Sequence, residues 1–457
     1  MAVREIACIG AGYVGGPTMA VLADRCPEVR VTVLDVDPGR VAAWNSDRLP
    51  VYEPGLAEVV ARARGRNLFF ADLAPERLAT AEMIFVCVNT PTKSYGEGAG
   101  MASDLQHWER SARTIHAASQ AGAIVVEKST VPVRTAEAMA RILQQGGDGR
   151  RFEVLSNPEF LAEGTAVADL EDPARVLIGS ETTPSGRAAA EALAGLYRQW
   201  VPAERIVFTN VWSSELSKLV ANAMLAQRVS SVNAVSALCE QTAADVTEIS
   251  HAVGLDPRIG PRFLEAGVGF GGSCFRKDLL NLVYICEQQG LAEVAAYWRM
   301  VVTLNDHQIA RFARGVVSHL FNTVADKRLA VLGFAFKPDS DDTRDSPALH
   351  ICRHLLAERA QLAVTDPRAL DNARRDLAGA EPVVVFEPDP YAAARGAHAI
   401  LLLTAWREYA TLDYERILAG MERPAFLFDG RNLLDAERLH ALGFNVVPVG
   451  KPPLLHT

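Results

Sequence analysis

The chain has 457 residues, of which 49% are hydrophobic and 22% charged, and its formal net charge is -9. This composition is typical of a globular protein of two or three domains. It argues against a nucleic-acid partner, which would require a basic surface. No run approaches the roughly 20 apolar residues of a membrane span, so we expect no membrane partner. The N-terminus passes from charge directly into a strand pattern, so we also expect no signal peptide.

The cysteines are seven in number and lie scattered along the chain without a CxxC pair. An odd, scattered set argues against a disulfide framework or a zinc site and indicates a reducing compartment. We therefore expect a cytoplasmic protein that holds no metal.

The first part of the chain alternates strands and helices. Residues 4–37, "REIACIGAGYVGGPTMAVLADRCPEVRVTVLDVD", have the pattern strand, glycine turn, helix, strand, and further strand-like runs follow at 83–90, 123–130 and 152–160. Such alternation predicts a parallel sheet covered on both faces. We place this Rossmann-type domain at residues 1–210.

The first turn, "GAGYVGG", places Gly10, Gly12 and Gly15 in a GxGxxG between strand and helix. The first glycine makes the tight bend, the second lets the backbone approach a pyrophosphate, and the third packs the helix on the strand. Asp35 ends the next strand, where it would bind a ribose hydroxyl, and an acid there favours NAD over NADP. Arg40 nearby weakens that preference, and a glycine turn without a ligand is the alternative.

The stretch 212–255 has no strand character and carries apolar residues at helical spacing. Ser213 or Ser214 would cap the start of this long helix. Lys218 and Asn222 lie four residues apart, on its polar side. For Lys218 a solvated helix face is the ordinary alternative.

From about residue 325 the first pattern returns, as strand, loop, helix and a strand that ends in aspartate. This second copy, residues 325–457, lacks the three-glycine turn, so we expect it to bind a nucleotide differently. The predicted fold is α/β, with two Rossmann-type lobes with parallel sheets joined by a long central helix region, residues 211–324. We expect that region to form the hinge and a subunit interface, and an ordinary core helix is compatible with both roles.

The stretch "GVGFGGSCFRKD", residues 267–278, places Gly271 and Gly272 before a serine and Cys274. A helix is predicted to begin there, so the thiol would lie at the positive end of a helix dipole, where thiolates are favoured. Asp278 follows on the same helical face, and the glycines would let a ligand approach the main chain. A buried apolar cysteine is the commoner fate of a single thiol.

Three further polar residues occur in short runs outside the long helix. "NPEFLAEGT" contributes the carboxylates Glu159 and Glu163, and "EKSTVP" contributes Thr130 as a hydroxyl at a strand end. Each could equally be an ordinary loop or surface residue.

Eight motifs resemble, in chain order, those of the UDP-glucose 6-dehydrogenases of the UDP-glucose/GDP-mannose dehydrogenase family. They are "GAGYVGG", "VNTPTK", "EKSTVPV", "NPEFLAEGTA", "ELSKLVANAMLAQR", "GVGFGGSCFRKD", "LGFAFKPDSDDTRDS" and "DGRN". The resemblance extends from about residue 4 to residue 446. It implies NAD-dependent, four-electron oxidation of a nucleotide-linked glucose at C6, with UDP-glucose or dTDP-glucose as substrate.

The resemblance also implies a role for each catalytic position. Cys274 matches the nucleophile that holds the aldehyde as a thiohemiacetal, which is then oxidised to a thioester. Lys218 matches the lysine that stabilises oxyanion charge, and Glu159 matches the general base for thioester hydrolysis. Asp278, Asn222 and Thr130 match residues that hold water, share in proton transfer or hold the reacting end of the sugar.

Ligand contacts implied by the resemblance fall into two sets. The cofactor set comprises Gly10, Gly12, Tyr13, Val14, Gly15, Asp35, Arg40, Val88, Asn89, Thr90, Thr130, Glu163 and Arg344. The substrate set comprises Glu159, Phe160, Leu161, Glu163, Lys218, Asn222, Arg258, Phe263, Leu264, Phe270, Gly271, Cys274, Phe336, Lys337 and Arg431. Arg258 resembles an arginine contributed across the interface of a homodimer or higher homo-oligomer.

Rival functions differ in what they require of the sequence. A GDP-mannose or UDP-N-acetylhexosamine dehydrogenase would share the cysteine and the lysine but not the sugar and base pockets. A two-electron hydroxyacid or acyl-CoA dehydrogenase has no use for a cysteine nucleophile. A non-catalytic nucleotide-sugar sensor would have no need to retain Cys274, Lys218, Asp278 and Glu159.

Overall fold

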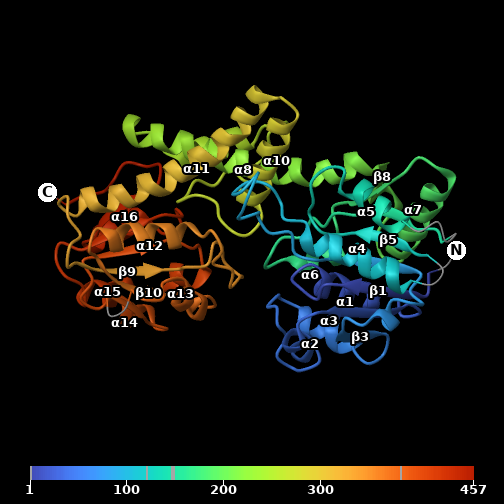
Figure 1. Ribbon diagram of the computed structural model, residues 1–457. Coiled ribbons are helices and arrows are strands. Elements are labelled where there is room, and N and C mark those ends of the chain that lie inside the picture. The colour runs from blue at the N-terminus through green and yellow to red at the C-terminus, as the bar shows by residue number, and fades with distance from the viewer. Residues whose placement is uncertain (1–2, 120–121, 146–149, 381–382, 457) are drawn as a thin grey trace. The chain divides into compact units, whose positions relative to one another are not determined.

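The computed structural model of the chain describes residues 3–119, 122–145, 150–380 and 383–456. The chain divides into two compact units, Met1–Ala221 and Asn222–Thr457. Each unit is built on a sheet with helices against it (Figure 1). The boundary falls within one long helix, α8 (Val211–Thr242).

The first unit holds an eight-stranded sheet in the order β3-β2-β1-β4-β5-β6-β7-β8. Its strands are β1 (Glu5–Ile9), β2 (Arg30–Asp35), β3 (Leu68–Asp72), β4 (Met83–Val86), β5 (Ile124–Glu127), β6 (Glu153–Ser156), β7 (Val176–Ser180) and β8 (Ile206–Asn210). The predicted parallel arrangement is confirmed for β1 to β6.

The edge formed by β7 and β8 runs against the other strands, which the sequence pattern did not predict. An antiparallel bridge joins Ser156 of β6 to Gly179 of β7, and β8 pairs in parallel with β7. An antiparallel step needs no crossover over the sheet face, and reversed edge strands are common on parallel sheets. The chain can therefore reverse here, and residues 157–165 form a loop after the carboxyl end of β6.

Both faces of this sheet are covered, as the alternation of strands and helices predicted. Along β1, Ile6 and Cys8 join one hydrophobic cluster, while Ala7 and Ile9 join the other, because successive strand residues point to opposite faces. The covering helices are α1 (Gly15–Arg25), α2 (Pro38–Trp44), α3 (Leu56–Ala63), α4 (Gln106–Ala118), α5 (Thr135–Leu143), α6 (Ala166–Glu171) and α7 (Pro184–Tyr197).

Helix α8 begins earlier than the serine caps predicted. Its first residue is Val211, and the side-chain oxygen of Asn210 accepts from the backbone N–H of Ser213 at 2.8 Å. Asn210 therefore supplies a bond of the kind that an N-cap makes. The Ser214 hydroxyl instead donates to the carbonyl of Ser156 at 3.2 Å and is buried. The cap prediction failed because β8 runs directly into the helix and leaves the asparagine at the junction.

The second unit holds a six-stranded sheet in the order β11-β10-β9-β12-β13-β14, parallel throughout. Its strands are β9 (Arg328–Leu332), β10 (Gln361–Thr365), β11 (Val384–Phe386), β12 (Ala399–Leu402), β13 (Phe426–Asp429) and β14 (Asn445–Pro448). Strand β9 lies between β10 and β12 as β1 lies between β2 and β4. The predicted return of the Rossmann pattern is confirmed.

The helices of the second unit are α9 (Val246–Gly254), α10 (Phe275–Gln288), α11 (Ala292–His319), α12 (Pro347–Ala357), α13 (Leu370–Asp376), α14 (Pro390–Ala394), α15 (Tyr414–Ala419) and α16 (Ala436–Leu442). Helix α11 places Ile309, Ala313 and Val316 in the same hydrophobic cluster as Leu329 and Val331 of β9. No helix in the described part of the chain is both long and apolar enough to span a bilayer. The described residues also contain no cluster of His, Cys, Asp and Glu suited to a metal ion.

Candidate active site

The glycine turn separates glycines that the fold needs from one that it does not. Gly10 has φ +106°, and a Cβ there would lie 2.5 Å from the Cys87 carbonyl oxygen. A Cβ on Gly15 would lie 2.0 Å from the carbonyl oxygen of Gly10. Gly12 is different, because a Cβ there would meet no atom within 4 Å. Packing thus explains Gly10 and Gly15, and open space at Gly12 fits the close approach of a ligand.

Asp35, at the end of β2, is held beside this turn. One of its oxygens accepts from the backbone N–H of Ala11 at 2.8 Å and the other from that of Asp37 at 2.9 Å. The Arg40 guanidinium also contacts the carboxylate, at 3.1 Å, and the Arg40 side chain is 42% exposed. The sequence placed Asp35 where a ribose would be bound, and its contact with Ala11 joins it to the turn.

The ends of β4 and β5 lie side by side and carry the next predicted cofactor positions. The Thr90 hydroxyl donates to the carbonyl of Thr130 at 2.8 Å, and the Ser129 hydroxyl donates to that of Val88 at 2.7 Å. Residues 88–90 and Thr130 therefore belong to one edge of the sheet. The carboxyl ends of parallel strands are the usual place for a ligand in such folds.

Glu159 lies in a buried polar cluster. Its Oε2 is 2.8 Å from Nζ of Lys128, and its Oε1 accepts from the backbone N–H of Phe160 at 2.8 Å and of Leu161 at 3.2 Å. Burial by itself would raise the pKa of Glu159, but the Lys128 charge and these hydrogen bonds outweigh it and lower that pKa. Burial likewise opposes the charge of Lys128, yet the Glu159 carboxylate raises the pKa of Lys128.

Lys218 lies over the ring of Phe160, with its Nζ 5.2 Å from the ring centroid. Arg175 lies closer to that ring, at 3.8 Å, and burial lowers the Arg175 pKa. Lys218 is buried, so the solvated helix face that was its alternative is excluded. Glu163 lies in the loop just before α6, where the buried Glu53 carboxylate accepts from the Gly164 N–H at 2.6 Å.

Cys274 stands apart from the other cysteines. It is exposed and occupies the N-cap position of α10, whereas the other six, all within the described ranges, are buried. Burial raises the pKa of the Cys26 and Cys352 thiols to about 12, which makes them poor nucleophiles. The predicted helix start is confirmed, and the buried apolar cysteine that was the alternative is excluded for Cys274.

Two predicted catalytic residues meet within the second unit. The Asn222 side-chain amide donates to Oδ2 of Asp278 at 2.6 Å, and the Lys277 ammonium donates to Oδ1 at 2.7 Å. Asp278 is 1% exposed and lies on α10 one turn after Cys274, whose carbonyl accepts from the Asp278 N–H at 2.9 Å. The carboxylate is therefore fixed by two side chains and stays beside the helix start that carries the thiol.

The glycines before Cys274 serve the packing of the second unit. A Cβ on Gly271 would lie 2.4 Å from the carbonyl oxygen of Asp345, and one on Gly272, where φ is +84°, would lie 2.9 Å from the Phe336 ring. Packing against these atoms by itself requires glycine at both positions. The approach of a ligand to the main chain at Gly271 stays a prediction.

The remaining predicted residues of the second unit lie in its loops. Half-buried Arg431 donates to the carbonyl of Leu403 at 2.7 Å, and burial lowers its pKa to about 10, so it stays cationic at neutral pH. Arg344 and Arg258 each form an ion pair two residues away, with Asp342 and Asp256. The other predicted substrate residues of this unit are Phe263 and Leu264 before the glycine stretch, Phe270 within it, and Phe336 and Lys337 after β9.

Three sequence profiles of one family match the chain in order. They describe the NAD binding domain at residues 4–201, the central domain at 212–307 and the UDP binding domain at 330–436 of the UDP-glucose/GDP-mannose dehydrogenase family. The chain belongs to this family. The resemblance inferred from the eight motifs is thereby confirmed.

Relatives within the family match at full length. The chain is 56% identical to UDP-glucose 6-dehydrogenase 1 of Oryza sativa subsp. japonica and 54% identical to UDP-glucose 6-dehydrogenase 1 of Arabidopsis thaliana, covering 98% of this chain and 97% of each relative. Among solved structures, a UDP-glucose dehydrogenase from Pyrobaculum islandicum superposes with a TM-score of 0.86 at 32% identity, covering 98% of both chains. A UDP-D-ManNAc dehydrogenase from Pyrococcus horikoshii superposes with a TM-score of 0.82 at 27% identity, covering 98% of this chain and 99% of that one.

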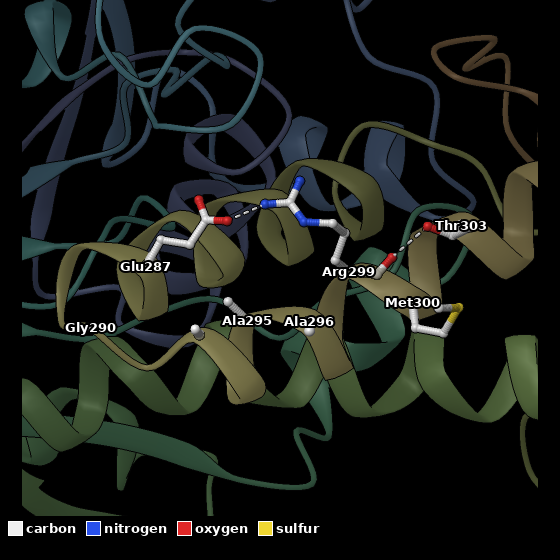
Figure 2. Close-up of a pocket in the computed structure, with 8 residues that line it drawn as sticks. Glu287, Gly290, Ala295, Ala296, Arg299, Met300 and Thr303 are labelled. Atoms are coloured by element: carbon white, nitrogen blue, oxygen red, sulfur yellow. Dashed lines mark hydrogen bonds and ion pairs between the residues drawn. The ribbon is translucent and has the colours of Figure 1, made fainter.

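This family member also has a cavity of about 380 Å³ that the predicted site residues do not line. It lies between the end of α10 and the first half of α11, beside the ion pair of Arg299 with Glu287 (Figure 2). Met300 and Thr303 line it from α11. Position and lining therefore separate this cavity from the candidate active site.

Sequence reasoning missed several residues that hold the site of this dehydrogenase together. Lys128 and Lys277 pair with the two predicted carboxylates, and Trp44 donates from its ring to the Ala11 carbonyl at 2.8 Å below the glycine turn. Lys128 could have been found, because a lysine inside an apolar strand run is rare without a buried partner. Nothing in the local pattern marks Trp44, whose partner lies 33 residues away.

Proposed function

We propose that this chain oxidises UDP-glucose at C6 to the uronic acid with two equivalents of NAD. Identities of 54% and 56% over 98% of the chain to curated UDP-glucose 6-dehydrogenases support this substrate. The observation that carries the chemistry is the single exposed thiol, Cys274, at the start of α10 within the described chain. A four-electron oxidation without release of the aldehyde needs such a covalent holder.

NAD binding is proposed for the turn that contains Gly12, where open space faces the backbone. Asp35 would receive the ribose hydroxyls, and the strand-end residues Val88, Asn89, Thr90 and Thr130 would line the same edge. Tyr13, Val14, Glu163 and Arg344 complete the proposed cofactor set. NAD, when bound, accepts a hydride in each of the two oxidations.

Cys274 is proposed to attack the aldehyde, so that its sulfur forms a bond to C6 and the product of the second oxidation is a thioester. Lys218, a cation kept out of solvent, would stabilise the negative charge that develops on the substrate oxygen. Asp278, fixed by Asn222 and Lys277, would position the reacting group rather than move freely. Glu159 would take a proton from the water that cleaves the thioester, which releases Cys274 as the thiolate.

Substrate recognition is proposed for two sets of residues. Phe160, Leu161 and Glu163 would contact the sugar nucleotide from the first unit. Phe263, Leu264, Phe270, Gly271, Phe336, Lys337 and Arg431 would contact it from the second. Arg431 retains its charge despite burial, which suits a phosphate contact.

We further propose three domains, residues 1–210, 211–324 and 325–457, and a homodimer or higher homo-oligomer in a cytoplasmic setting. Met224, Val235 and Leu238 on α8 are exposed apolar residues, which support a subunit interface there. Arg258 is 87% exposed on its side chain, as a residue reaching into a neighbour's site would be. Light scattering should show a dimer or larger species, and Leu238→Glu should shift it towards the monomer. Leu455→Glu, at an exposed apolar residue outside α8, should not.

The test counts NADH per sugar consumed when purified protein meets NAD and a panel of UDP-glucose, dTDP-glucose, GDP-mannose and UDP-N-acetylhexosamines. We expect two equivalents, with UDP-glucose the fastest substrate. One equivalent, or a faster member of the panel, would contradict the proposal. Cys274→Ala should make no acid, whereas Cys286→Ala, at a buried thiol on the same helix, should retain full activity.

A further inference from the structure

Lys128, directly after β5, has no role that the family resemblance implies. It is 3% exposed, and its ammonium is 2.8 Å from Oε2 of Glu159. The ammonium also donates to Oδ1 of Asn157 at 3.1 Å and to the Tyr197 hydroxyl at 3.3 Å. A lysine this deeply buried is costly to desolvate, and it is found in cores only with partners that compensate its charge.

The partners of Lys128 are themselves fixed. The Tyr197 hydroxyl donates to Oδ1 of Asn157 at 2.8 Å, and the Asn157 amide donates to the carbonyl of Leu177 in β7 at 2.8 Å. The ammonium therefore faces three oxygens: it donates to Asn157 and Tyr197 and forms an ion pair with Glu159. It cannot move without losing one of them, so it holds the position of Glu159 Oε2.

The Glu159 carboxylate is nearly saturated with donors. A carboxylate has about four acceptor positions. Lys128 lies against one oxygen, and the backbone N–H groups of Phe160 and Leu161 bind the other. About one acceptor position is left, on the buried Oε2.

We infer that Lys128 is a positioning residue that keeps the buried Glu159 carboxylate ionised and directs its remaining acceptor position towards the water that cleaves the thioester. This inference rests on the proposed function, because it takes the role of Glu159 in hydrolysis from there. In that step the water oxygen bonds to the thioester carbon and one water proton passes to Glu159. The carbon–sulfur bond breaks, and the sulfur leaves as the thiolate.

The charged and titratable groups around Glu159 set the expected pH effect. They are Lys128 after β5, Tyr197 on α7, Lys218 on α8 and, next to Tyr197, Cys87 after β4. Burial raises the pKa of a carboxyl group and a nearby cation lowers it. Without the Lys128 charge the pKa of Glu159 must rise, so the acid limb of the rate profile must move to higher pH.

The experiment compares Lys128→Met, Lys128→Arg and Glu159→Gln in the full-length protein, with Lys327→Met as the control. Lys327 donates to the carbonyls of Leu320 and Thr323, in a loop of the second unit outside the proposed site. Each variant is mixed with excess NAD and UDP-glucose. The readouts are the NADH burst, the steady-state kcat and KM, the pH profile, and the intact-protein mass.

We expect Lys128→Met to lower kcat about 100-fold at neutral pH, the low end of the effect of a general base. The ratio kcat/KM for UDP-glucose should change less than about threefold, because the steps up to the thioester are untouched, so KM should fall together with kcat. The acid limb should rise by about one pH unit or more, and the sugar acyl group should accumulate on Cys274 after a normal NADH burst. Lys128→Arg should recover at least part of the rate, and Lys327→Met should match the wild type.

Loss of the buried cation leaves the Glu159 charge unpaired, which is strongly destabilising and can unfold the first unit. The double variant Lys128→Met/Glu159→Gln, which removes both charges, then takes the place of the single one. It should turn over as slowly as Glu159→Gln and no slower, because Lys128 acts only through Glu159. A double variant at least about tenfold slower than Glu159→Gln would overturn the inference.

Two results separate the inference from the proposed function. If Glu159→Gln accumulates the adduct while Lys128→Met behaves like Lys327→Met, the positioning role is wrong and the proposed function stands. If Glu159→Gln turns over at the wild-type rate without an adduct, the hydrolytic role of Glu159 fails, and the inference about Lys128 fails with it.

Discussion

The two sheets repeat one arrangement, and the repeat differs at its acidic residue. In the first unit, Gly10 follows β1 with φ +106° and its N–H donates to the Leu34 carbonyl of β2 at 2.7 Å. In the second, Gly333 follows β9 with φ +93° and its N–H donates to the Thr365 carbonyl of β10 at 2.8 Å. In each unit an aspartate accepts hydrogen bonds from this turn: Asp35, at the end of β2, and Asp366, directly after β10.

The partners of those aspartates separate a ligand site from a structural one. Asp366 accepts from four backbone N–H groups and from the ring nitrogen of Trp406. Asp35 accepts from two backbone N–H groups, and its other contact is the half-exposed side chain of Arg40. A side chain in solvent can be displaced by a ribose, whereas backbone groups and a packed ring cannot. The comparison therefore assigns the dinucleotide to the first unit.

The largest effect on stability is expected at Asp366. Asp366→Asn should lower the free energy of unfolding by about 3 kcal/mol or more, because several buried donors lose their acceptor. The matched Asp35→Asn should cost about 1 kcal/mol, since it loses fewer fixed partners. Chemical denaturation followed by tryptophan fluorescence measures both. Equal losses at the two positions would contradict the distinction between them.

The glycines of the first turn should show the next largest effects. Gly10→Ala forces a side chain into the Cys87 carbonyl at a positive φ, and we expect a loss of about 2–4 kcal/mol. The free energy of unfolding of Gly12→Ala should lie within about 1 kcal/mol of the wild-type value. NADH binding should nevertheless weaken about tenfold or more, because only the ligand needs that space. Thermal unfolding and a fluorescence titration with NADH separate the two outcomes. Unchanged affinity in Gly12→Ala would place the pyrophosphate elsewhere.

Cofactor preference should change at Asp35 and not at Asp366. Removing its charge relieves repulsion of a 2′-phosphate, so the ratio of the Kd values for NADPH and NADH should fall about 10- to 100-fold in Asp35→Asn. Asp366→Asn, measured where it is still folded, should keep the wild-type ratio. A change of the ratio in Asp366→Asn alone would reverse the assignment of the two units.

The smallest effect is expected at Arg40. Its contact with Asp35 is half exposed, so Arg40→Ala should change the free energy of unfolding by less than about 1 kcal/mol. NADPH binding should weaken a few-fold, because a cation near the 2′-position is lost. NADH binding should hold or improve, since the arginine no longer competes for the carboxylate. Weaker NADH binding would mean that Arg40 itself contacts the cofactor.

The sequence alone determined the repeated α/β architecture, the glycine turn, the acid at the predicted ribose position and the helix start that carries Cys274. These features are local: each depends on residues within about one strand–turn–helix segment, where periodicity and glycine spacing indicate the backbone path. The family resemblance followed from the same short motifs. Asn210 at the start of α8 and the reversed edge strands β7 and β8 escaped prediction, because strand direction and the exact helix start depend on neighbouring elements.

Only the tertiary structure decided what the polar residues do. Lys128 and Glu159 are 31 positions apart, and Asn222 and Asp278 are 56 positions apart. No local pattern can pair such residues. The glycines before Cys274 look alike in sequence, yet atoms of Asp345 and Phe336 fill their space. Which charges are buried together and which space is filled depend on packing between distant segments, and that packing determines the charge and direction of the proposed catalytic groups.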